Sequence, residues 1–599
     1  MQKLDKQETL RHSTAHVLAA AVLEMFPEAK FAIGPATENG FYYDFDLPRT
    51  LIPEDLDILE EKMKKIVKEN HPFRKKNISI KNAADHFKKA KQPYKVQLIK
   101  DLKKPARNAT HSVAGGGKNK TITVYKSGPF VDLCSGPHLD STGEINAKAI
   151  KLTKISGAYW KGDESEKQLQ RIYGVVFNDK KELKKYLHML KEAEKRDHKK
   201  LGKELDLFSI HPEAPGSPFW HPRGMIIWNE LEKFGKSLRK NYAYQEIQTP
   251  QLAKNTLWKT SGHWQHYKDS MYHFDIDKET YCLKPMDCPF NIKIYQTRQR
   301  SYKELPIRYT EIGRVLRKEK SGELNGLLRV NAITQDDAHV FLIENQVESE
   351  IKTMLKMVKE YYGVFGLDPQ FYLATRPDDY MGDIKTWNKA EKDLVSALKK
   401  EKIKYEIKEK DGVFYGPKID VDMKDALGRR WQMATIQLDF QLPKRFEAEY
   451  IDNAGEKKTP VLIHAAIFGA FERFIGVLLE HFGGKLPLWL SPVQVEIIPV
   501  SDKFNKYAEK INAELLKNNV RSEINNRAES LGKRISESEK QKIPYMLVVG
   551  EKEVKSNSVN IRLRDNKKLS DAKDRAGKQT VMKLDKFVEK VVEEIEKKK

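Results

Sequence analysis

The stretch LLRVNAITQDDAHVF at residues 327–341 decides the interpretation of the whole chain. Side chains in a β-strand alternate between two faces, so residues two apart share a face. This period predicts an apolar face and a polar face, the latter carrying Arg329, Gln335, Asp337 and His339. Four such groups on a buried face need bonding partners, which favours a ligand platform over a packed core. A solvated edge face is the alternative.

Two possible partners for His339 lie far away in the sequence. Cys288 occurs in YCLKPMDCPF (281–290) and His464 in VLIHAAIFGAFERFIGVLLEH (461–481). Each alone is more often structural, because lone cysteines and histidines commonly pack in cores. Together the three supply nitrogen and sulfur ligands in the number typical of a catalytic zinc that keeps one coordination position open.

A second group of metal-type side chains lies near the start of the chain. His12 and His16 in RHSTAH are four residues apart, and Cys134 and His138 in DLCSGPH repeat that spacing. Residues four apart share one face of a helix. The four groups could therefore form a zinc site, although an HxxxH pattern alone is a weak signal.

The 599 residues are too many for one hydrophobic core and predict about three or four domains. Mixed helix and strand patterns run to residue 177, and a charged segment with Leu183, Leu187 and Leu190 on one stripe predicts a connecting helix over 178–205. A large region fills 206–490. Alternating strands and helices over 491–599 are typical of a small parallel α/β domain. The expected fold class is α+β multidomain.

Composition indicates a folded, strongly basic protein. The formal net charge of +23 would attract a polyanion such as nucleic acid, although a general lysine-rich bias explains it equally well. Three cysteines argue against a disulfide framework. No stretch approaches the roughly 20 apolar residues of a membrane span, and Met1 opens onto polar residues without a signal-peptide core. We expect no membrane partner and a cytoplasmic location.

Six segments resemble, in order, those of bacterial threonyl-tRNA synthetases. They are YCLKPMDCP (281–289), RYTEIGRVLRKEKSGELNGLLRV (308–330), TQDDAHVF (334–341), GVFYGPKIDV (412–421), IQLDFQLPKRF (436–446) and IHAAIFGAFERFIG (463–476). The resemblance covers practically the whole chain. It implies an α+β editing domain, a class II catalytic domain on an antiparallel sheet, and a C-terminal α/β anticodon-binding domain. The implied reaction is ATP-dependent ligation of L-threonine to tRNA(Thr) through threonyl-adenylate.

The resemblance also implies roles in reading threonine. Cys288, His339 and His464 would hold one zinc per subunit, which binds the threonine amino and hydroxyl groups. Asp337 would receive the hydroxyl proton, and Gln335, Tyr415 and Gln437 would line the pocket. A hydrophobic pocket separates threonine from isosteric valine by only about a hundredfold, whereas a site that demands a hydroxyl does better. Serine also carries a hydroxyl and would be accepted by this site, so the mischarged seryl-tRNA(Thr) needs editing.

Activation of threonine needs cations around the phosphates of ATP, which is bound with Mg²⁺. The resemblance assigns Arg317 to the α-phosphate, Arg473 to the γ-phosphate and Glu319 to the adenine side, with Arg329 assisting. The sequence pattern itself leaves Arg473 outside an apolar helical stripe, formed by Ile467, Phe471, Phe474, Ile475 and Leu478. Without its flanking motifs, a solvated helix charge would be the better interpretation of Arg473.

Three departures from the family pattern lie in this region. Ile333 stands where a phenylalanine usually stacks on adenine, and Ala470 stands where a serine is common. CPFN at 288–291 replaces the usual CPGH. All three leave the proposed ligands and arginines in place.

For residues 1–177 the resemblance is to the editing domain shared by threonyl- and alanyl-tRNA synthetases. CSGPH and the following ISGAYWKGDESEKQLQRIYG (155–174) carry it. It implies that His12, His16, Asp132, Cys134 and His138 hydrolyse seryl-tRNA(Thr) without a metal. Because the editing motif begins almost at Met1, we expect the family's further small N-terminal domain to be absent.

For residues 491–599 the resemblance implies anticodon reading by Arg527, Glu553 and Arg562. Ala528 follows Arg527 where the family commonly has a base-contacting asparagine. It also implies a homodimer, with the segment GMIIWNELEKFGKSLRKNYAYQEIQTP (224–250) at the interface.

Two other functions predict different residue patterns. A prolyl or seryl synthetase would not be expected to combine this zinc triad with the HxxxH and CxxxH editing motifs. A non-charging paralogue that binds RNA or edits in trans would be expected to lack Arg317, Arg473 or a zinc ligand, and all are present.

Overall fold

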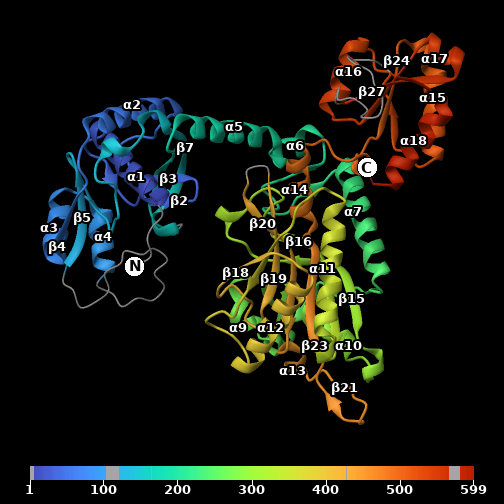
Figure 1. Cartoon of the computed structure of the whole chain (residues 1–599), viewed down its shortest axis with the longest axis horizontal. Coiled ribbons are helices and arrows are strands. Elements are labelled where there is room, and N and C mark those ends of the chain that lie inside the picture. Colours follow the sequence, from blue (N-terminus) through green and yellow to red (C-terminus); the bar gives the residue numbers. More distant parts are fainter. Residues whose placement is uncertain (1–5, 103–120, 164, 426–427, 565–579, 599) are drawn as a thin grey trace. The chain divides into compact units, whose positions relative to one another are not determined.

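The computed structural model describes residues 6–102, 121–163, 165–425, 428–564 and 580–598 (Figure 1). Its contacts divide the chain into two compact units, residues 1–191 and 192–599. Both units mix helices with sheets, and the α+β multidomain fold class is confirmed.

The first unit holds two separate sheets. One has the order β1-β3-β8-β7 with β2 paired to β3, and the other is β4-β5-β6. The strands are β1 (Lys30–Phe31), β2 (Ala36–Thr37), β3 (Gly40–Asp46), β4 (Arg74–Ser79), β5 (Thr121–Ser127), β6 (Phe130–Leu133), β7 (Ile150–Tyr159) and β8 (Gln168–Val176). The helices are α1 (Lys6–Met25), α2 (Pro53–Glu69), α3 (Ile80–Lys89) and α4 (Pro93–Asp101). The alanine-rich middle of α1 favours helix, and its small side chains let α1 pack closely in the core.

The predicted single connecting helix is two helices. α5 (Lys180–Arg196) ends where Asp197 takes a non-helical conformation, and α6 (His198–Glu204) begins there. The Asp197 carboxylate accepts a hydrogen bond from the backbone N–H of Lys199, which is the N-cap arrangement. The strongly helix-forming residues on both sides of Asp197 gave no sign of this N-cap, so the prediction of one continuous helix is wrong at Asp197.

An eight-stranded sheet forms the centre of the second unit, in the order β11-β15-β16-β23-β20-β19-β17-β18. All neighbours pair antiparallel except the two edge pairs, β11 with β15 and β17 with β18. Its strands are β11 (Gln245–Glu246), β15 (Ile307–Leu316), β16 (Ala332–Leu342), β17 (Gln370–Ala374), β18 (Tyr405–Lys408), β19 (Lys418–Lys424), β20 (Arg430–Asp439) and β23 (Val461–Ala470). The predicted antiparallel sheet is confirmed.

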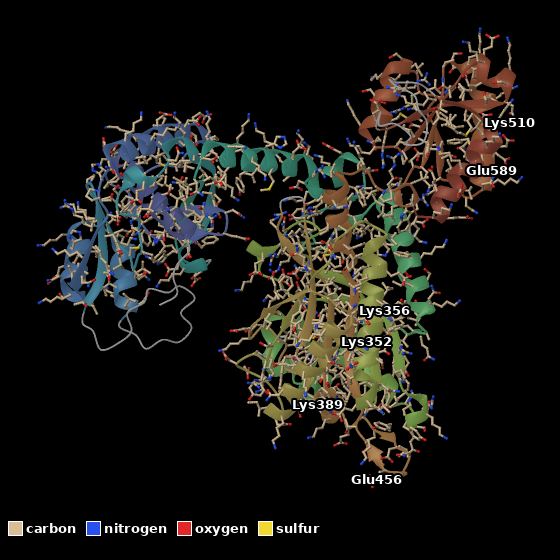
Figure 2. The ribbon with its side chains drawn as sticks, in the orientation of Figure 1. Lys352, Lys356, Lys389, Glu456, Lys510 and Glu589 are labelled. Atoms are coloured by element: carbon tan, nitrogen blue, oxygen red, sulfur yellow. The ribbon has the colours of Figure 1, made fainter. Side chains whose placement is uncertain are left out.

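Helices cover one face of this sheet. They are α7 (Pro222–Asn241), α11 (Val347–Gly363), α12 (Ile384–Lys400) and α14 (Phe471–Phe482), and their apolar sides join the largest core cluster. On α11, Ile351, Met354 and Leu355 are buried, whereas Lys352 and Lys356 lie on the outer side (Figure 2). This is the amphipathic pattern expected of a surface helix.

Side-chain alternation leaves the other face of the sheet for the site. On β16, Ala338 and Val340 point into the helix-covered core, so Asp337 and His339 point to the opposite face. That face is closed partly by α10 (Cys288–Tyr295). The same unit also contains α8 (Asn255–Ser261), α9 (His263–Tyr267), α13 (Leu442–Arg445) and three small sheets. These pair β9 (Phe208–Ser209) with β10 (Phe219–Trp220), β14 (Glu279–Leu283) with β12 (Leu252–Lys254) and β13 (His273–Ile276), and β21 (Tyr450–Ile451) with β22 (Lys457–Lys458).

The C-terminal part of the second unit has a sheet of order β25-β24-β26-β27-β28. Its strands are β24 (Val495–Pro499), β25 (Ser522–Ile524), β26 (Tyr545–Val549), β27 (Ser558–Leu563) and β28 (Thr580–Lys583); its helices are α15 (Asn505–Lys517), α16 (Leu531–Lys540), α17 (Glu551–Ser556) and α18 (Leu584–Glu596). β24, β25 and β26 are parallel, but β27 and β28 are antiparallel. The expected parallel arrangement is therefore wrong for the pairing of β26 with β27, because the connection through α17 is too short to carry the chain back across the sheet. β28 in turn pairs antiparallel with β27.

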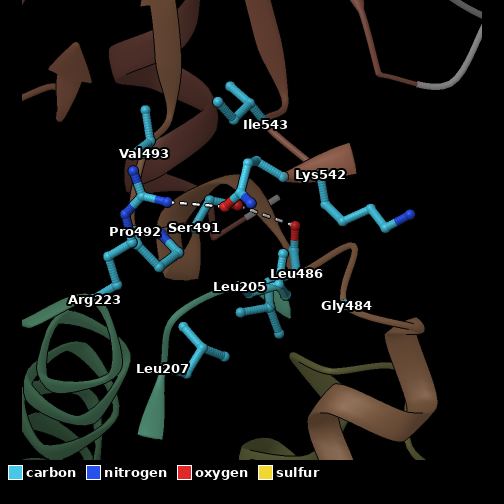
Figure 3. Close-up of a pocket in the computed structure, with 11 residues that line it drawn as sticks. Leu205, Leu207, Arg223, Gly484, Leu486, Ser491, Pro492, Val493, Lys542 and Ile543 are labelled. Atoms are coloured by element: carbon cyan, nitrogen blue, oxygen red, sulfur yellow. Dashed lines mark hydrogen bonds between the residues drawn. The ribbon is translucent and has the colours of Figure 1, made fainter. Parts of the chain in front are cut away.

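A small pocket lies where this part meets the rest of the second unit (Figure 3). Leu205, Leu207 and Leu486 give it an apolar lining. The guanidinium of Arg223, on α7, donates a hydrogen bond to Oε1 of Gln541 at 2.9 Å, next to the end of α16. Among the helices that the structure describes, none combines the length and apolar character of a membrane span.

Candidate functional site

Three potential metal ligands meet on the open face of the large sheet. His339 on β16 lies directly opposite His464 on β23, with ring centroids 4.8 Å apart. Cys288 begins α10, and the ligand atoms of the three residues lie within 4.8 Å of one another. All three side chains are buried. The structure thus brings together the donor set of a three-ligand zinc site.

The electrostatics of this cluster suit a cation. Burial raises the pKa of the Cys288 thiol, and the carboxylates of Asp337 and Asp439 raise it further. Burial lowers the pKa of His339. Nε2 of His464 lies 2.8 Å from Oδ2 of Asp439, which leaves Nδ1 for a metal in the manner common for ligating histidines. A divalent cation would convert the thiol into the thiolate, so the residues present fit zinc.

The predicted amino-acid pocket surrounds the same cluster. The ring of Tyr415 lies 5.0 Å from that of His464, and its hydroxyl donates to Oε1 of Gln437 at 2.6 Å. Gln437 is the register partner of His464 on β20. Oδ2 of Asp337 lies 3.5 Å from Nδ1 of His339. Polar groups from three strands therefore converge beside the three ligands.

Arg329 is not on the predicted strand face. β16 begins at Ala332, so the alternation of side chains does not extend back to Arg329, and that prediction is wrong. Arg329 lies in the irregular segment before the strand, where its Nη2 is 2.9 Å from Glu319 and 2.5 Å from Glu323. Gln335 is on the strand, but a register shift against β23 separates it from Asp337.

Three arginines approach one another at the edge of this pocket. Arg317 directly follows β15, and Arg473 lies in the first turn of α14. Nε of Arg473 donates to the carbonyl of Leu328 at 3.0 Å, and Nη1 donates to that of Gln432 at 2.8 Å. Burial lowers the pKa of Arg473, and the charges of Arg317 and Arg329 lower it further. Cations held close enough to repel one another form a site for a polyanion.

The apolar stripe predicted around Arg473 begins later than expected. Ile467 belongs to β23, because α14 starts at Phe471, so its inclusion in a helical stripe is wrong. The two single-residue departures, Ile333 and Ala470, lie together in one small apolar cluster with two valines. The two departures from the family pattern therefore change the same apolar cluster.

All five predicted editing residues come together in the first unit. His12 and His16 lie on α1, Asp132 lies on β6, and Cys134 and His138 follow that strand. Sγ of Cys134 lies 3.3 Å from Nε2 of His12 and 3.2 Å from Nε2 of His138. Nε2 of His16 lies 3.6 Å from Oδ2 of Asp132.

Burial sets the protonation states of this cluster. It raises the pKa of Cys134 to about 12 and lowers the pKa of His12, His16 and His138. The thiol is therefore protonated and the imidazoles are neutral near pH 7. Neutral imidazoles can accept a proton from water, whereas a protonated thiol is a poor nucleophile.

The sequence patterns missed Lys95 and Tyr43 at this site. Lys95 forms an ion pair with Asp132, and its Nζ donates to the Tyr43 hydroxyl at 3.1 Å. The Tyr43 hydroxyl donates to Oδ2 of Asp132 at 2.6 Å. Lys95 is 3% exposed, which is rare for a lysine and marks a functional environment. Burial is not visible in sequence, so no spacing signal could have found it.

His263 is a second residue that the patterns missed. It begins α9 and is buried, with Nδ1 2.8 Å from Oγ of Ser261. Burial, followed by the nearby His464 and Arg317, lowers its pKa to about 3. Among the described residues, Nε2 of His263 has no hydrogen-bond partner. His263 therefore places a neutral imidazole near both His464 and Arg317.

The three predicted anticodon residues are engaged within the C-terminal part. Nη2 of Arg527 lies 2.7 Å from Glu537, and Nη2 of Arg562 lies 3.0 Å from Glu539. Both glutamates are on α16. Glu553 accepts a hydrogen bond from the backbone N–H that precedes α17, at 2.9 Å, and so caps that helix. Arg527 is exposed, whereas Arg562 is half-buried beside its acidic partner.

Three family models match the chain. The tRNA synthetase class II core domain (G, H, P, S and T) matches residues 272–482, the anticodon binding domain matches 494–594, and the threonyl and alanyl tRNA synthetase second additional domain matches 122–173. Together with the antiparallel sheet and its arginines, these matches define a class II aminoacyl-tRNA synthetase with an editing and an anticodon-binding domain.

The chain is also similar over nearly its whole length to threonine--tRNA ligases. The chain is 48% identical to the threonine--tRNA ligase of Caldanaerobacter subterraneus subsp. tengcongensis, in an alignment that covers 98% of this chain and 87% of that protein. It is 47% identical to the threonine--tRNA ligase of Clostridioides difficile, over 98% of this chain and 88% of that protein. The crystal structure of the RNA binding domain of threonyl-tRNA synthetase from Cryptosporidium parvum matches with a TM-score of 0.63 and 39% identity, over 66% of this chain and 98% of that one. The chain belongs to the threonine--tRNA ligase family. It is an enzyme that joins threonine to tRNA(Thr) and carries an editing domain.

Proposed function

We propose that one zinc ion per chain, held by Cys288, His339 and His464, selects threonine for the ligase. The single observation that carries this proposal is the direct cross-strand pairing of His339 with His464, beside the thiol of Cys288. When bound, zinc supplies coordination positions for the amino and hydroxyl groups of threonine, and valine, which has no hydroxyl, can fill only the first.

The residues around the three zinc ligands contribute to the selection of threonine. Asp337 receives the proton of the threonine hydroxyl, and its position beside His339 supports that role. Tyr415 and Gln437 are joined by a hydrogen bond and form one wall of the pocket, with Gln335 further along β16. Buried polar groups discriminate strongly, because a substrate without a hydroxyl leaves them unpaired.

ATP, with Mg²⁺, binds along the arginine cluster in this proposal. Arg317 holds the α-phosphate and Arg473 the γ-phosphate, while Glu319 takes the adenine side. Arg329 assists after it leaves its ion pairs with Glu319 and Glu323. The charges of Arg317 and Arg329 contribute to lowering the pKa of Arg473, after burial, and this supports a polyanion as the partner of the cluster.

The editing unit, residues 1–177, clears seryl-tRNA(Thr) with His12, His16, Asp132, Cys134 and His138. Neutral imidazoles take the proton of an attacking water, and the ion pair of Lys95 with Asp132 holds the polar wall of the pocket. Residues 206–490 perform the ligation, connected by the linker 178–205. Residues 491–599 read the anticodon through Arg527, Glu553 and Arg562.

Two copies form the working enzyme in the cytoplasm, with residues 224–250 at the interface. α7 supplies most of that segment, and Arg239 on α7 donates to Asp336 of β16, next to Asp337. Asp336 lies on the helix-covered face of β16, so an interface at this helix would lie across the sheet from the amino-acid pocket. Sedimentation velocity tests the dimer, and a monomer at micromolar concentration would contradict it.

Metal analysis with threonine-dependent ATP–pyrophosphate exchange tests the central proposal. We expect one zinc per chain and exchange with threonine, weak exchange with serine and none with valine. A fully active preparation without zinc would contradict the proposal.

A further inference from the structure

His198, the first residue of α6, links the connecting helices to the loop of residues 326–328, which precedes Arg329. Its ring is 1% exposed. Nδ1 lies 2.8 Å from Oε1 of Glu480 on α14, and Nε2 accepts a hydrogen bond from the backbone N–H of Leu327 at 3.1 Å. A backbone N–H can only donate, so Nε2 carries the lone pair and Nδ1 carries the hydrogen that goes to Glu480.

This cluster is not a metal site, although Asp197, His198 and Glu480 are near enough to suggest one. Both ring nitrogens of His198 are already committed to protein partners. The second carboxylate oxygen of Glu480 faces Arg429, whose Nη2 is 3.7 Å away. The arrangement orients a loop rather than binding a cation.

The loop that His198 holds leads directly to the arginines of the ATP site. The carbonyl of Leu328, the next residue, accepts the hydrogen bond from Nε of Arg473, and Arg329 follows. Gly326 has a φ of +53°, and a Cβ there would lie 2.2 Å from Nε2 of His198. The backbone therefore passes so close to the ring that only glycine fits.

We propose that His198 is a positioning residue for ATP: its ring fixes the backbone of residues 326–328 and thereby orients Arg473 and Arg329 toward the triphosphate. The inference rests on the proposed ATP roles of these arginines and adds a residue outside the synthetase motifs. It also makes the linker segment a structural part of the ATP site.

Two substitutions separate the two hydrogen bonds of the ring. His198→Asn keeps a donor at the position of Nδ1 for Glu480 but has no acceptor at the position of Nε2. His198→Gln places its amide oxygen near the position of Nε2 and can accept from Leu327. ATP–pyrophosphate exchange is measured for both, with ATP and threonine varied separately and folding checked by thermal melting.

We expect His198→Asn to raise the KM for ATP about tenfold, the order expected when one buried N–H loses its acceptor. The KM for threonine should stay within about twofold, because the hydrogen bonds of residues 326–328 that the structure describes go to His198, to Arg473 and within the turn, and not to the amino-acid pocket. His198→Gln should restore most of the ATP affinity. Equal changes in kcat and both KM values, or a KM for ATP that neither variant alters, would overturn the inference.

Two further variants keep the test decisive. Gly326→Ala displaces the loop while retaining His198, so it should also raise the KM for ATP and covers the case in which His198→Asn fails to fold. Arg473→Ala tests the role of the arginine itself. If Arg473→Ala leaves the KM for ATP unchanged, the proposed arginine role fails; if it raises that KM while Gly326→Ala and His198→Asn do not, only the role of His198 fails.

Discussion

His339 and His464 occupy directly opposed positions on two antiparallel strands, with ring planes inclined at 76°. The pairing holds both imidazoles against the same buried thiol. Neighbouring strands of one sheet fix the positions of the two rings relative to each other, which preorganises the ligand geometry.

Cys288→Ala should remove zinc and abolish threonine-dependent exchange, because two remaining protein ligands do not make a stable zinc site. Zinc per chain, measured by atomic emission, and exchange activity check the result. Full zinc content and normal exchange in this variant would show that the ligand assignment is wrong.

Asp439→Asn should weaken zinc binding by about 10- to 100-fold, since Asp439 orients the ring of His464. Competition with a chelator measures the affinity. Asp452→Asn is a matched control, because Asp452 lies in the turn between β21 and β22. Within the part of the chain that the structure describes, its carboxylate accepts hydrogen bonds from backbone N–H groups of its own turn. Equal zinc affinities in the two variants would contradict the role of Asp439.

The double variant His12→Ala, His16→Ala should accumulate seryl-tRNA(Thr), because it removes two of the imidazoles that surround Cys134. Threonine activation should remain near normal, since these residues lie in the first compact unit and the arginines in the second. Deacylation of preformed seryl-tRNA(Thr) is the measurement. Undiminished clearance of serine would exclude the assigned editing site.

The pH profile of editing should differ from that of an ordinary histidine. Burial lowers the pKa of His12, His16 and His138, so their basic forms persist as the pH falls through about 6.5, the usual histidine pKa. The catalysed rate of seryl-tRNA(Thr) hydrolysis should therefore hold between about pH 7 and pH 6. A loss of half the rate near pH 6.5 would show that the imidazoles titrate normally.

Arg562→Ala should reduce discrimination between correct and altered anticodons by about 1–3 kcal/mol if Arg562 reads a base. If Arg562 is only an exposed cation, binding to all tRNA should weaken by a similar small factor. Charging of tRNA transcripts with altered second and third anticodon bases separates these outcomes. The exposed Ala528 offers no amide to share the reading, which increases the expected dependence on Arg562.

Glu539→Gln should strengthen tRNA binding by about 1.4- to 5-fold, because Arg562 must leave Glu539 before it can meet a base and a surface ion pair contributes about 0.2–1 kcal/mol. Filter binding at fixed ionic strength measures the effect. Glu589→Gln, on the exposed side of α18, is a control for the change in net charge. An equal gain in both variants would attribute the effect to net charge alone.

The sequence was most informative where local pattern and family resemblance coincided. The alternation in TQDDAHVF placed Asp337 and His339 on one face, and the structure has them there. It failed where the pattern was extended beyond an element. Arg329 precedes β16 and Ile467 precedes α14, because side-chain periodicity ends wherever the backbone changes conformation.

The α+β multidomain fold class, the enzyme family and the residue types available for each site follow from the amino-acid sequence alone. Which of these residues become buried neighbours follows from the folded chain. Lys95, His198 and His263 carry no motif spacing, and each acquires its environment from segments far away in the chain. Desolvation and hydrogen-bond geometry depend on three-dimensional packing, whereas the periods of strands and helices relate residues only a few positions apart in the sequence.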